Sequence, residues 1–187
     1  IDLAAPTGRA AKRLAELTNL EASTIHRLLK WDMHKNVFAM DENNPLSTQL
    51  LVIDEFSMVD SLLFSKLLKA GKHVTKILMI GDDQQLPSVS CGNVLKDMMS
   101  SGVVPVVALN TIYRQSEGSG IVELAHAIRN NQYHPDLLQA QDVHFIPAAN
   151  YEVPGKILEI IQEAIDDGFE MDEIQVLAPM YRGVAGI

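Results

Sequence analysis

Residues 50–53 form a short, unbroken apolar run that is followed directly by two carboxylates, Asp54 and Glu55. Such a run predicts a strand that is buried on both faces of a parallel sheet. In open α/β sheets, ligands bind beyond the carboxyl ends of the strands, which is where both carboxylates would emerge. There, one carboxylate can hold the water shell of Mg²⁺ while the other activates a water molecule for attack on a phosphate. A strand that ends in a simple acidic turn is the alternative.

The same succession of apolar run, polar corner and helical periodicity recurs along the chain. Apolar runs predict strands at residues 1–5, 50–53, 77–80, 103–109 and 174–178. Helical spacing of apolar residues predicts helices that begin near residues 10, 61, 94, 121 and 152. Strands that alternate with helices predict βαβ units, and therefore an α/β fold with a parallel sheet.

Local signals refine two of these elements. Asp60 or Ser61 is suited to cap the helix that follows Glu55, and Gly71 is suited to end it. Pro105 weakens the prediction of a strand in the first half of the run at residues 103–109, because proline cannot donate to a strand ladder.

Two stretches interrupt the alternation of strands and helices. Residues 31–49 are polar with scattered aromatic residues, and we interpret them as an insertion, either a hairpin or an ordinary surface loop. Residues 116–120 are rich in serine and glycine and predict a hinge. We therefore assign residues 1–111 to most of one domain, and residues 112–187 to the hinge and the beginning of a second domain.

The composition limits the classes of function. A net charge of −9 argues against indiscriminate coating of nucleic acid, although a local basic track needs only a few cations. The single cysteine, Cys91, excludes an internal disulfide and is compatible with a reducing cytosol. No apolar run approaches the roughly 20 residues that cross a bilayer. We expect a cytoplasmic protein without a membrane segment and, since the chain begins inside a predicted strand, a piece of something longer.

Five short stretches occur in an order that is typical of one known family. They are APTGRAA (residues 5–11), TIHRLL (24–29), DEFSMVD (54–60), GDDQQLPSV (81–89) and YRQ (113–115). In this order they resemble motifs Ia, Ib, II, III and IV of superfamily 1 DNA helicases of the RecD-like group, the exodeoxyribonuclease V alpha-chain type. The resemblance extends from Pro6 to about Arg129, with a weaker echo at residues 176–180.

The resemblance implies a RecA-like fold, which is the parallel sheet of P-loop NTPases flanked by helices. Residues 1–111 would be most of the first RecA-like motor domain, and residues 112–187 would begin the second. The glycine-rich phosphate loop that ends in Gly-Lys-Thr/Ser is absent before motif Ia, so we expect this piece to begin downstream of it. The late motifs of the second motor domain are also absent.

The resemblance also implies roles in ATP hydrolysis with Mg²⁺. Asp54 would hold Mg²⁺ through water, and Glu55 would be the general base for the attacking water. Gln85 would sense the γ-phosphate, and its place in the motif favours it over Gln84. Arg114 would reach the γ-phosphate from the far side of the cleft. The alternatives are a glutamine-rich turn for Gln85 and a surface ion pair for Arg114.

For single-stranded DNA, the resemblance indicates the starts of two helices. Pro6, Thr7 and Arg9 follow a strand, where backbone N–H groups and a hydroxyl can face a DNA phosphate. His26 and Arg27 would extend this track. The alternative for His26 is a contact with a neighbouring group on a helix that packs on the core.

Aromatic residues and histidines give weaker signals. Trp31, Phe38 and Tyr113 are the aromatic residues best placed to stack on bases or on adenine, although core packing is the more frequent use of such side chains. The spacing of the histidines predicts no zinc site.

Taken together, the motifs imply a fragment of an ATP-dependent DNA helicase that translocates 5′ to 3′ on single-stranded DNA in recombination or repair. Subunits of a nuclease–helicase complex, as in exodeoxyribonuclease V, are candidate partners. Because the phosphate loop is missing, we expect the fragment alone to be inactive. The alternatives are a degenerate motor that serves as a DNA-binding or subunit-docking module, and the helicase domain of a conjugative relaxase.

Overall fold

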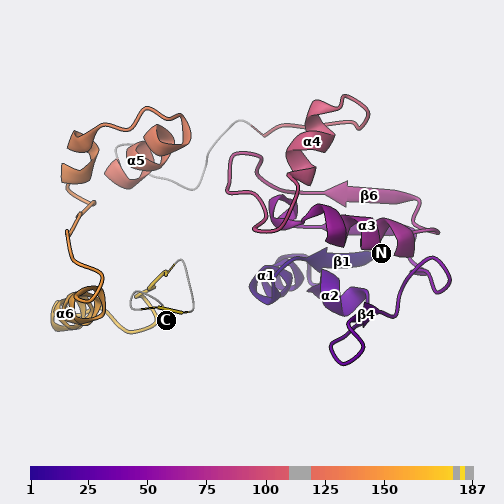
Figure 1. Cartoon of the computed structure of the whole chain (residues 1–187), viewed down its shortest axis with the longest axis horizontal. Helices are drawn as coiled ribbons and strands as arrows, with labels where there is room; N and C mark the ends of the chain where they lie inside the picture. Colours follow the sequence, from indigo (N-terminus) through magenta and orange to yellow (C-terminus); the bar gives the residue numbers. More distant parts are fainter. Residues whose placement is uncertain (110–118, 179–181, 184–187) are drawn as a thin grey trace. The chain divides into compact units, whose positions relative to one another are not determined.

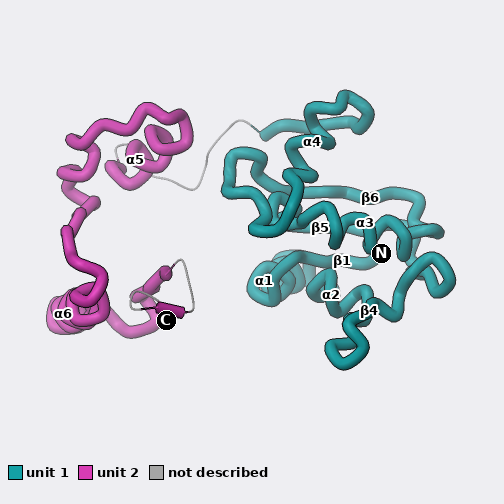
Figure 2. Tube along the Cα trace, in the orientation of Figure 1, with its two compact units in different colours: residues 1–111 teal, residues 112–187 magenta. Residues whose placement is uncertain are grey.

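The computed structural model describes residues 1–109, 119–178 and 182–183. The chain divides into two compact units, residues 1–111 and residues 112–187, which are coloured separately in Figure 2. The assignment of the second unit to the beginning of a second motor domain stays a prediction. Among the described residues, no helix combines the length and the apolar character that are needed to span a bilayer.

A four-stranded sheet organises the first unit (Figure 1). Its strands are β1 (Asp2–Ala5), β2 (Ala22–Thr24), β5 (Leu50–Ile53) and β6 (Lys76–Met79), in the order β2-β1-β5-β6. Each neighbouring pair is parallel, so the carboxyl ends of all four strands lie along the same edge of the sheet. The predicted α/β fold with a parallel sheet is confirmed.

Strand β5 is covered more completely on one face than on the other. Leu51 and Ile53 are fully buried, whereas Leu50 and Val52 are half-buried. Successive side chains of a strand point to opposite faces, so the core covers one face of β5 completely and the other only in part. The prediction that β5 is buried on both faces was therefore wrong for the second face.

The first crossover of the sheet, from β1 to β2, runs through one helix, and a second, short helix follows it. Helix α1 (Gly8–Thr18) connects β1 to β2 and packs against both strands. Its N-cap is Thr7, whose hydroxyl oxygen accepts a hydrogen bond from the backbone N–H of Ala10 at 3.2 Å. The short helix α2 (Ile25–Leu28) follows β2 directly and is capped in the same way by Thr24.

Helix α3 (Ser61–Ala70) connects β5 to β6 and begins and ends as predicted. Asp60 is its N-cap, and the Oδ1 atom of Asp60 accepts a hydrogen bond from the backbone N–H of Leu63 at 2.7 Å. Gly71 follows the last turn, and its backbone N–H donates to the carbonyl of Leu67 at 2.8 Å. The cap and the stop are local, which is why the sequence alone predicted both.

A cluster of buried apolar side chains joins the sheet to these helices. The 3₁₀ turn η1 (Phe56–Met58) follows β5, and helix α4 (Val94–Ser100) packs against it. Phe56 is fully buried and meets Phe64 edge to face, with 5.4 Å between the ring centroids. The other buried members are Ala4, Ile25, Leu29, Leu46, Leu51, Ile53, Val59, Leu67, Ala70, Val94 and Leu95.

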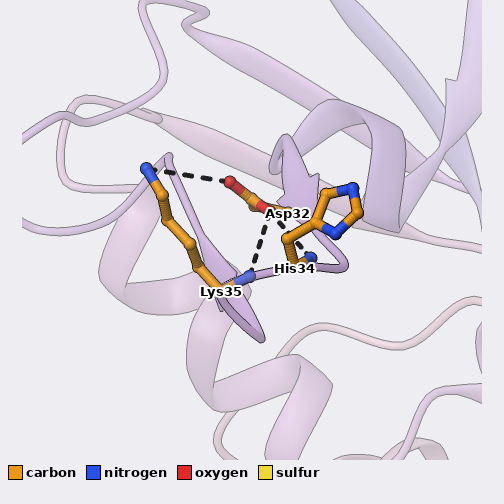
Figure 3. A network of polar contacts seen from close by, with 3 residues as sticks. All are labelled: Asp32, His34 and Lys35. Carbon is orange, nitrogen blue, oxygen red and sulfur yellow. Dashed lines mark hydrogen bonds and ion pairs between the residues drawn. The ribbon is translucent and has the colours of Figure 1, made fainter.

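The insertion at residues 31–49 contains a small antiparallel hairpin, β3 (Trp31–Asp32) paired with β4 (Val37–Phe38). Of the two alternatives for this stretch, the hairpin is therefore correct. Its turn is closed by Asp32, whose Oδ1 atom accepts hydrogen bonds from the backbone N–H groups of His34 at 2.9 Å and Lys35 at 3.1 Å (Figure 3). An aspartate that bonds to the backbone two and three residues ahead is a common way to form such a turn.

Two predicted strands do not occur in the described residues. Residues 103–109 have no regular structure, and Val103, Val107 and Leu109 are 83%, 88% and 92% exposed. Residues 174–178 also form no strand. A strand requires a neighbour for its backbone hydrogen bonds, and neither run pairs with one of the strands in the described sheets. The apolar runs alone were therefore not sufficient signals.

The second unit contains α5 (Gly120–Arg129), the 3₁₀ turn η2 (Pro135–Gln139) and α6 (Val153–Asp166). Asp142 fixes the start of α5 although it is distant in sequence. Its Oδ2 atom accepts a hydrogen bond from the Ser119 hydroxyl at 2.7 Å, and its Oδ1 atom accepts one from the backbone N–H of Gly120 at 3.0 Å.

The contacts of Asp142 also affect its protonation. The Ser119 hydroxyl, followed by backbone N–H groups, lowers the pKa of the Asp142 carboxyl below its ordinary value. A lowered pKa means that the folded state favours the charged form, so this contact weakens as the pH falls through that pKa.

Replacing Asp60 by alanine removes the acceptor at the start of α3. We expect the free energy of unfolding of the first unit to fall by about 0.5–2 kcal/mol, the usual effect of losing an N-cap. Asp60→Asn keeps an acceptor oxygen and should stay close to the original value. Urea unfolding followed by the fluorescence of Trp31, the single tryptophan of the chain, measures both. Equal stabilities for the alanine variant and the original chain would contradict the capping role.

Candidate active site

Three loops leave the carboxyl edge of the sheet side by side. They follow β1, β5 and β6 and begin with Pro6, Asp54 and Ile80. Backbone hydrogen bonds join the loops after β5 and β6 to the neighbouring strands and to each other. The N–H of Asp54 donates to the carbonyl of Ala4 at 3.0 Å, the N–H of Ile80 donates to Ile53 at 2.8 Å, and the N–H of Phe56 donates to Ile80 at 2.8 Å. The sheet therefore holds the starts of all three loops together.

The two carboxylates after β5 stand on a tight turn. The Oδ1 atom of Asp54 accepts a hydrogen bond from the backbone N–H of Glu55 at 3.0 Å. Glu55 has φ 52° and ψ 40°, which is the left-handed conformation. This conformation costs a residue with a side chain about 1–2 kcal/mol, and strained backbone of this kind is frequent at functional sites. Both side chains are half-buried, so they remain accessible from the sheet edge.

The donor set around Asp54 fits Mg²⁺ held mainly by water. The Oδ1 atom is engaged by the backbone, which leaves the Oδ2 atom to accept from a metal-bound water. In the described part of the chain, no three His, Cys, Asp or Glu side chains lie close enough to hold a metal together. Mg²⁺ usually takes one or two carboxylates and completes its shell with water and phosphate oxygens, so a larger protein cage is not needed.

The loop after β6 separates the roles of its two glutamines. The side-chain amide of Gln84 donates to the Oδ2 atom of Asp83 at 2.8 Å. The backbone N–H of Gln85 donates to the carbonyl of Asp82 at 3.2 Å, and its exposed side chain has no hydrogen-bond partner among the described residues. An amide that is free to donate and accept suits phosphate sensing, so the geometry favours Gln85 over Gln84.

Gly81 lies where this loop passes over the turn that follows Glu55. A Cβ atom built on Gly81 would lie 3.0 Å from the backbone nitrogen of Ser57 and 3.2 Å from that of Phe56. It would also lie 2.9 Å from the Cδ2 atom of Leu95. The close approach of two backbones is a constraint that the sequence analysis missed, although a glycine directly after an apolar run was a signal for it.

The residues predicted to bind DNA lie at the same edge of the sheet. Pro6 and Thr7 are half-buried after β1, and Arg9 is exposed on the first turn of α1. The Thr7 hydroxyl oxygen caps α1 by accepting a hydrogen bond from the backbone N–H of Ala10, a role that the sequence analysis did not foresee. The hydroxyl hydrogen can still donate to a phosphate.

His26 and Arg27 follow β2 and are both exposed on α2. The ring of His26 lies 5.6 Å from that of Phe38 and 6.2 Å from that of Trp31, centroid to centroid. His26 therefore packs on the hairpin, which favours the alternative of a contact with neighbouring groups. Arg27 makes no such contact with an aromatic ring in the described residues, and its predicted role is unaffected.

The predicted residues Arg114 and Tyr113 lie outside the described residues. Within the description, two cavities of about 580 Å³ and 570 Å³ flank α3, and neither is lined by Asp54, Glu55 or Gln85. One lies between α3 and α4, and the other lies between α3 and the hairpin. The candidate site lies at the edge of the sheet, outside both of these cavities.

The parallel sheet, with its carboxylate turn and its neighbouring polar loops, defines an α/β fold of the RecA-like class. Residues 1–150 match the model of the AAA domain family, and the chain belongs to this family. The resemblance to RecD-like helicases drawn from the motifs is confirmed by relatives of that type.

Two relatives illustrate the similarity. The chain is 36% identical over 132 residues to the ATP-dependent RecD2 DNA helicase of Deinococcus radiodurans. This alignment covers 71% of this chain and 18% of the relative. It is 38% identical over 148 residues to the RecBCD enzyme subunit RecD of Mycolicibacterium smegmatis, covering 69% of this chain and 26% of the relative. The chain therefore spans about a quarter or less of these relatives.

A solved structure supports the fold. The Pif1 helicase from Bacteroides in complex with ADP-AlF3 and ssDNA aligns with a TM-score of 0.50 and 21% sequence identity, covering 94% of this chain and 52% of that one. At this level of identity the likeness concerns the fold alone.

Gly81→Ala should force the loop after β6 away from η1. Overpacking of this kind typically costs about 1–3 kcal/mol, so we expect a lower free energy of unfolding. Gly8→Ala is the matched control, because a Cβ at Gly8 meets nothing within 4 Å and the residue lies in a helix. We expect the control to be neutral or slightly stabilising. Urea unfolding of both variants gives the comparison, and a neutral Gly81→Ala would contradict the close approach.

Proposed function

We propose that this chain is part of the motor of an ATP-dependent DNA helicase, which translocates 5′ to 3′ on single-stranded DNA in recombination or repair. The observation that carries the proposal is the alignment of three loops at one sheet edge, with Asp54, Glu55 and Gln85 in the loops that follow the adjacent strands β5 and β6. The relatives are named as an ATP-dependent DNA helicase and as a subunit of the RecBCD enzyme. By analogy, subunits of such a complex are candidate partners, in the cytoplasm.

In this proposal the residues of the sheet edge divide the work of hydrolysis. Bound Mg²⁺ would neutralise charge on the phosphate oxygens. Asp54 would hold its water shell, and Glu55 would take the proton of the attacking water, a contribution of about 10²–10⁴ in rate. Gln85 would bond to the γ-phosphate through its free amide. The hydrogen bond between Phe56 and Ile80 joins the carboxylate turn to the start of the loop that carries Gln85.

Two further parts of the motor would complete the site. Arg114 would supply positive charge to the γ-phosphate, where such a cation contributes about 10³–10⁵ in turnover. The Gly-Lys-Thr/Ser phosphate loop is not among the residues of this chain. We therefore expect ATP hydrolysis only in a protein that supplies this loop together with the residues described here.

DNA would bind near the starts of α1 and α2. Thr7, Arg9 and Arg27 lie there, and the first turns of the helices offer backbone N–H groups. Contacts of this kind recognise phosphates and not bases, so binding would be independent of sequence. A local group of cations at this edge is compatible with the net charge of −9.

Glu55→Gln tests the proposed general base in a full-length protein that contains this chain. The amide cannot accept the proton, so we expect ATP turnover to fall by about 10²–10⁴, while nucleotide binding is retained. Glu42→Gln changes an exposed carboxylate on the insertion in the same way and should leave turnover unaltered. Unchanged turnover in Glu55→Gln would remove the catalytic role. If single-stranded DNA does not stimulate ATP turnover in the unmodified protein, the alternative of a docking module is favoured instead.

Arg9→Ala tests the proposed DNA track. We expect weaker binding of single-stranded DNA of any sequence, and a slope of affinity against salt concentration that is smaller by about one phosphate contact. Lys72→Ala is the control, since this exposed lysine lies before β6 at the opposite edge of the sheet. Fluorescence anisotropy at several salt concentrations measures both variants. If Arg9→Ala loses no more affinity for DNA than Lys72→Ala does, DNA does not bind at the start of α1.

A further inference from the structure

Ser57 carries a buried hydroxyl for which the described part of the chain offers no hydrogen-bond partner. The residue is 5% exposed and lies in η1, two positions after Glu55. Burying a hydroxyl without a partner costs free energy, so such groups are rare in folded proteins and call for a physical explanation. Neither the carboxylate chemistry nor the fold of the first unit requires a hydroxyl at this position.

The loop after β6 begins directly against Ser57. Gly81 has no side chain, and its missing Cβ would lie 3.0 Å from the backbone nitrogen of Ser57. The start of this loop, four residues before Gln85, therefore lies directly against η1. Leu95 of α4 lies at the same contact, because its Cδ2 atom would be 2.9 Å from a Cβ atom at Gly81.

The loop is attached to the rest of the unit at its two ends. At the first end the N–H of Phe56 donates to Ile80 at 2.8 Å, and at the second the N–H of Ser61 donates to Cys91 at 3.0 Å. Between these anchors, the hydrogen bonds of residues 82–90 stay within the loop, for the part of the chain that the structure describes. The loop can therefore shift as a unit without breaking a hydrogen bond to the sheet.

We propose that Ser57 is a positioning residue that couples the carboxylate turn to the loop that carries Gln85. When the loop closes on ATP, the Ser57 hydroxyl donates to a backbone carbonyl of residues 81–87. When the loop is open, the hydroxyl is unsatisfied. A hydroxyl suits this task because it turns about a single bond and needs no particular side chain as its partner. The inference rests on the proposed function, since it requires Gln85 to approach the γ-phosphate.

The coupling predicts an unusual response to Ser57→Ala in a full-length protein that contains this chain. Without nucleotide, the melting temperature should stay the same or rise, because the variant removes an unsatisfied group. With Mg-ATPγS, the affinity should fall by about 2- to 10-fold, the effect of losing one hydrogen bond in the bound state only. The kcat for ATP should fall by a similar factor. Ser57→Cys keeps a weak donor of similar size, so its nucleotide affinity and its kcat should lie between those of Ser57→Ala and those of the unmodified protein.

Thr48→Val is the matched control. Thr48 is 7% exposed, and its hydroxyl donates to the carbonyl of Leu50 at 3.0 Å, so it is a buried hydroxyl that already has a partner. We expect Thr48→Val to lower the melting temperature equally with and without nucleotide and to leave nucleotide affinity unchanged.

Two outcomes would overturn the coupling. If Ser57→Ala and Ser57→Cys behave like Thr48→Val, the hydroxyl is only structural. If both variants bind and hydrolyse ATP as the unmodified protein does, the loop does not use the hydroxyl. In either case the proposed function survives. If the unmodified protein itself binds no nucleotide, the proposed function fails and the coupling fails with it.

Discussion

The backbone hydrogen bonds that join the loops after β5 and β6 to strands β1 and β5 and to each other are the constraint on which the candidate site depends. They run from Asp54 to Ala4, from Ile80 to Ile53 and from Phe56 to Ile80. Each joins backbone groups, so they follow from the parallel register of β1, β5 and β6 and not from particular side chains. Because parallel strands end at a common edge, residues that are about 50 positions apart in sequence reach the same place.

Two local conformations adapt this edge to chemistry. Glu55 adopts a left-handed backbone conformation, which turns the chain sharply directly after Asp54. Gly81 lets the neighbouring loop lie against the same turn, because a Cβ would meet the backbone nitrogens of Phe56 and Ser57. The strained glutamate and the close glycine place an acidic turn and an amide-bearing loop in direct backbone contact. Under the proposed function, this contact would link hydrolysis to a movement of the loop.

The sequence predicted the elements whose signals are local. The apolar runs of β1, β5 and β6 and the cap of α3 by Asp60 were all correct. The runs at residues 103–109 and 174–178 were equally apolar but form no strand. The difference is that a strand needs a partner with which to share hydrogen bonds, and an apolar run does not say whether a partner is present. For the same reason, β2 (Ala22–Thr24), which has little apolar character, was missed although it pairs with β1.

For the site, the sequence by itself determined the chemical groups and the order of the motifs, and the resemblance to RecD-like helicases singled out Asp54, Glu55, Gln85 and Arg114. Tertiary structure decided how the described ones are used. It engaged the Gln84 amide with Asp83 and left that of Gln85 free, turned the Thr7 hydroxyl oxygen to its own helix, and buried the Ser57 hydroxyl. Residue type fixes which hydrogen bonds a side chain can make, but only the packed chain fixes which partners are within reach.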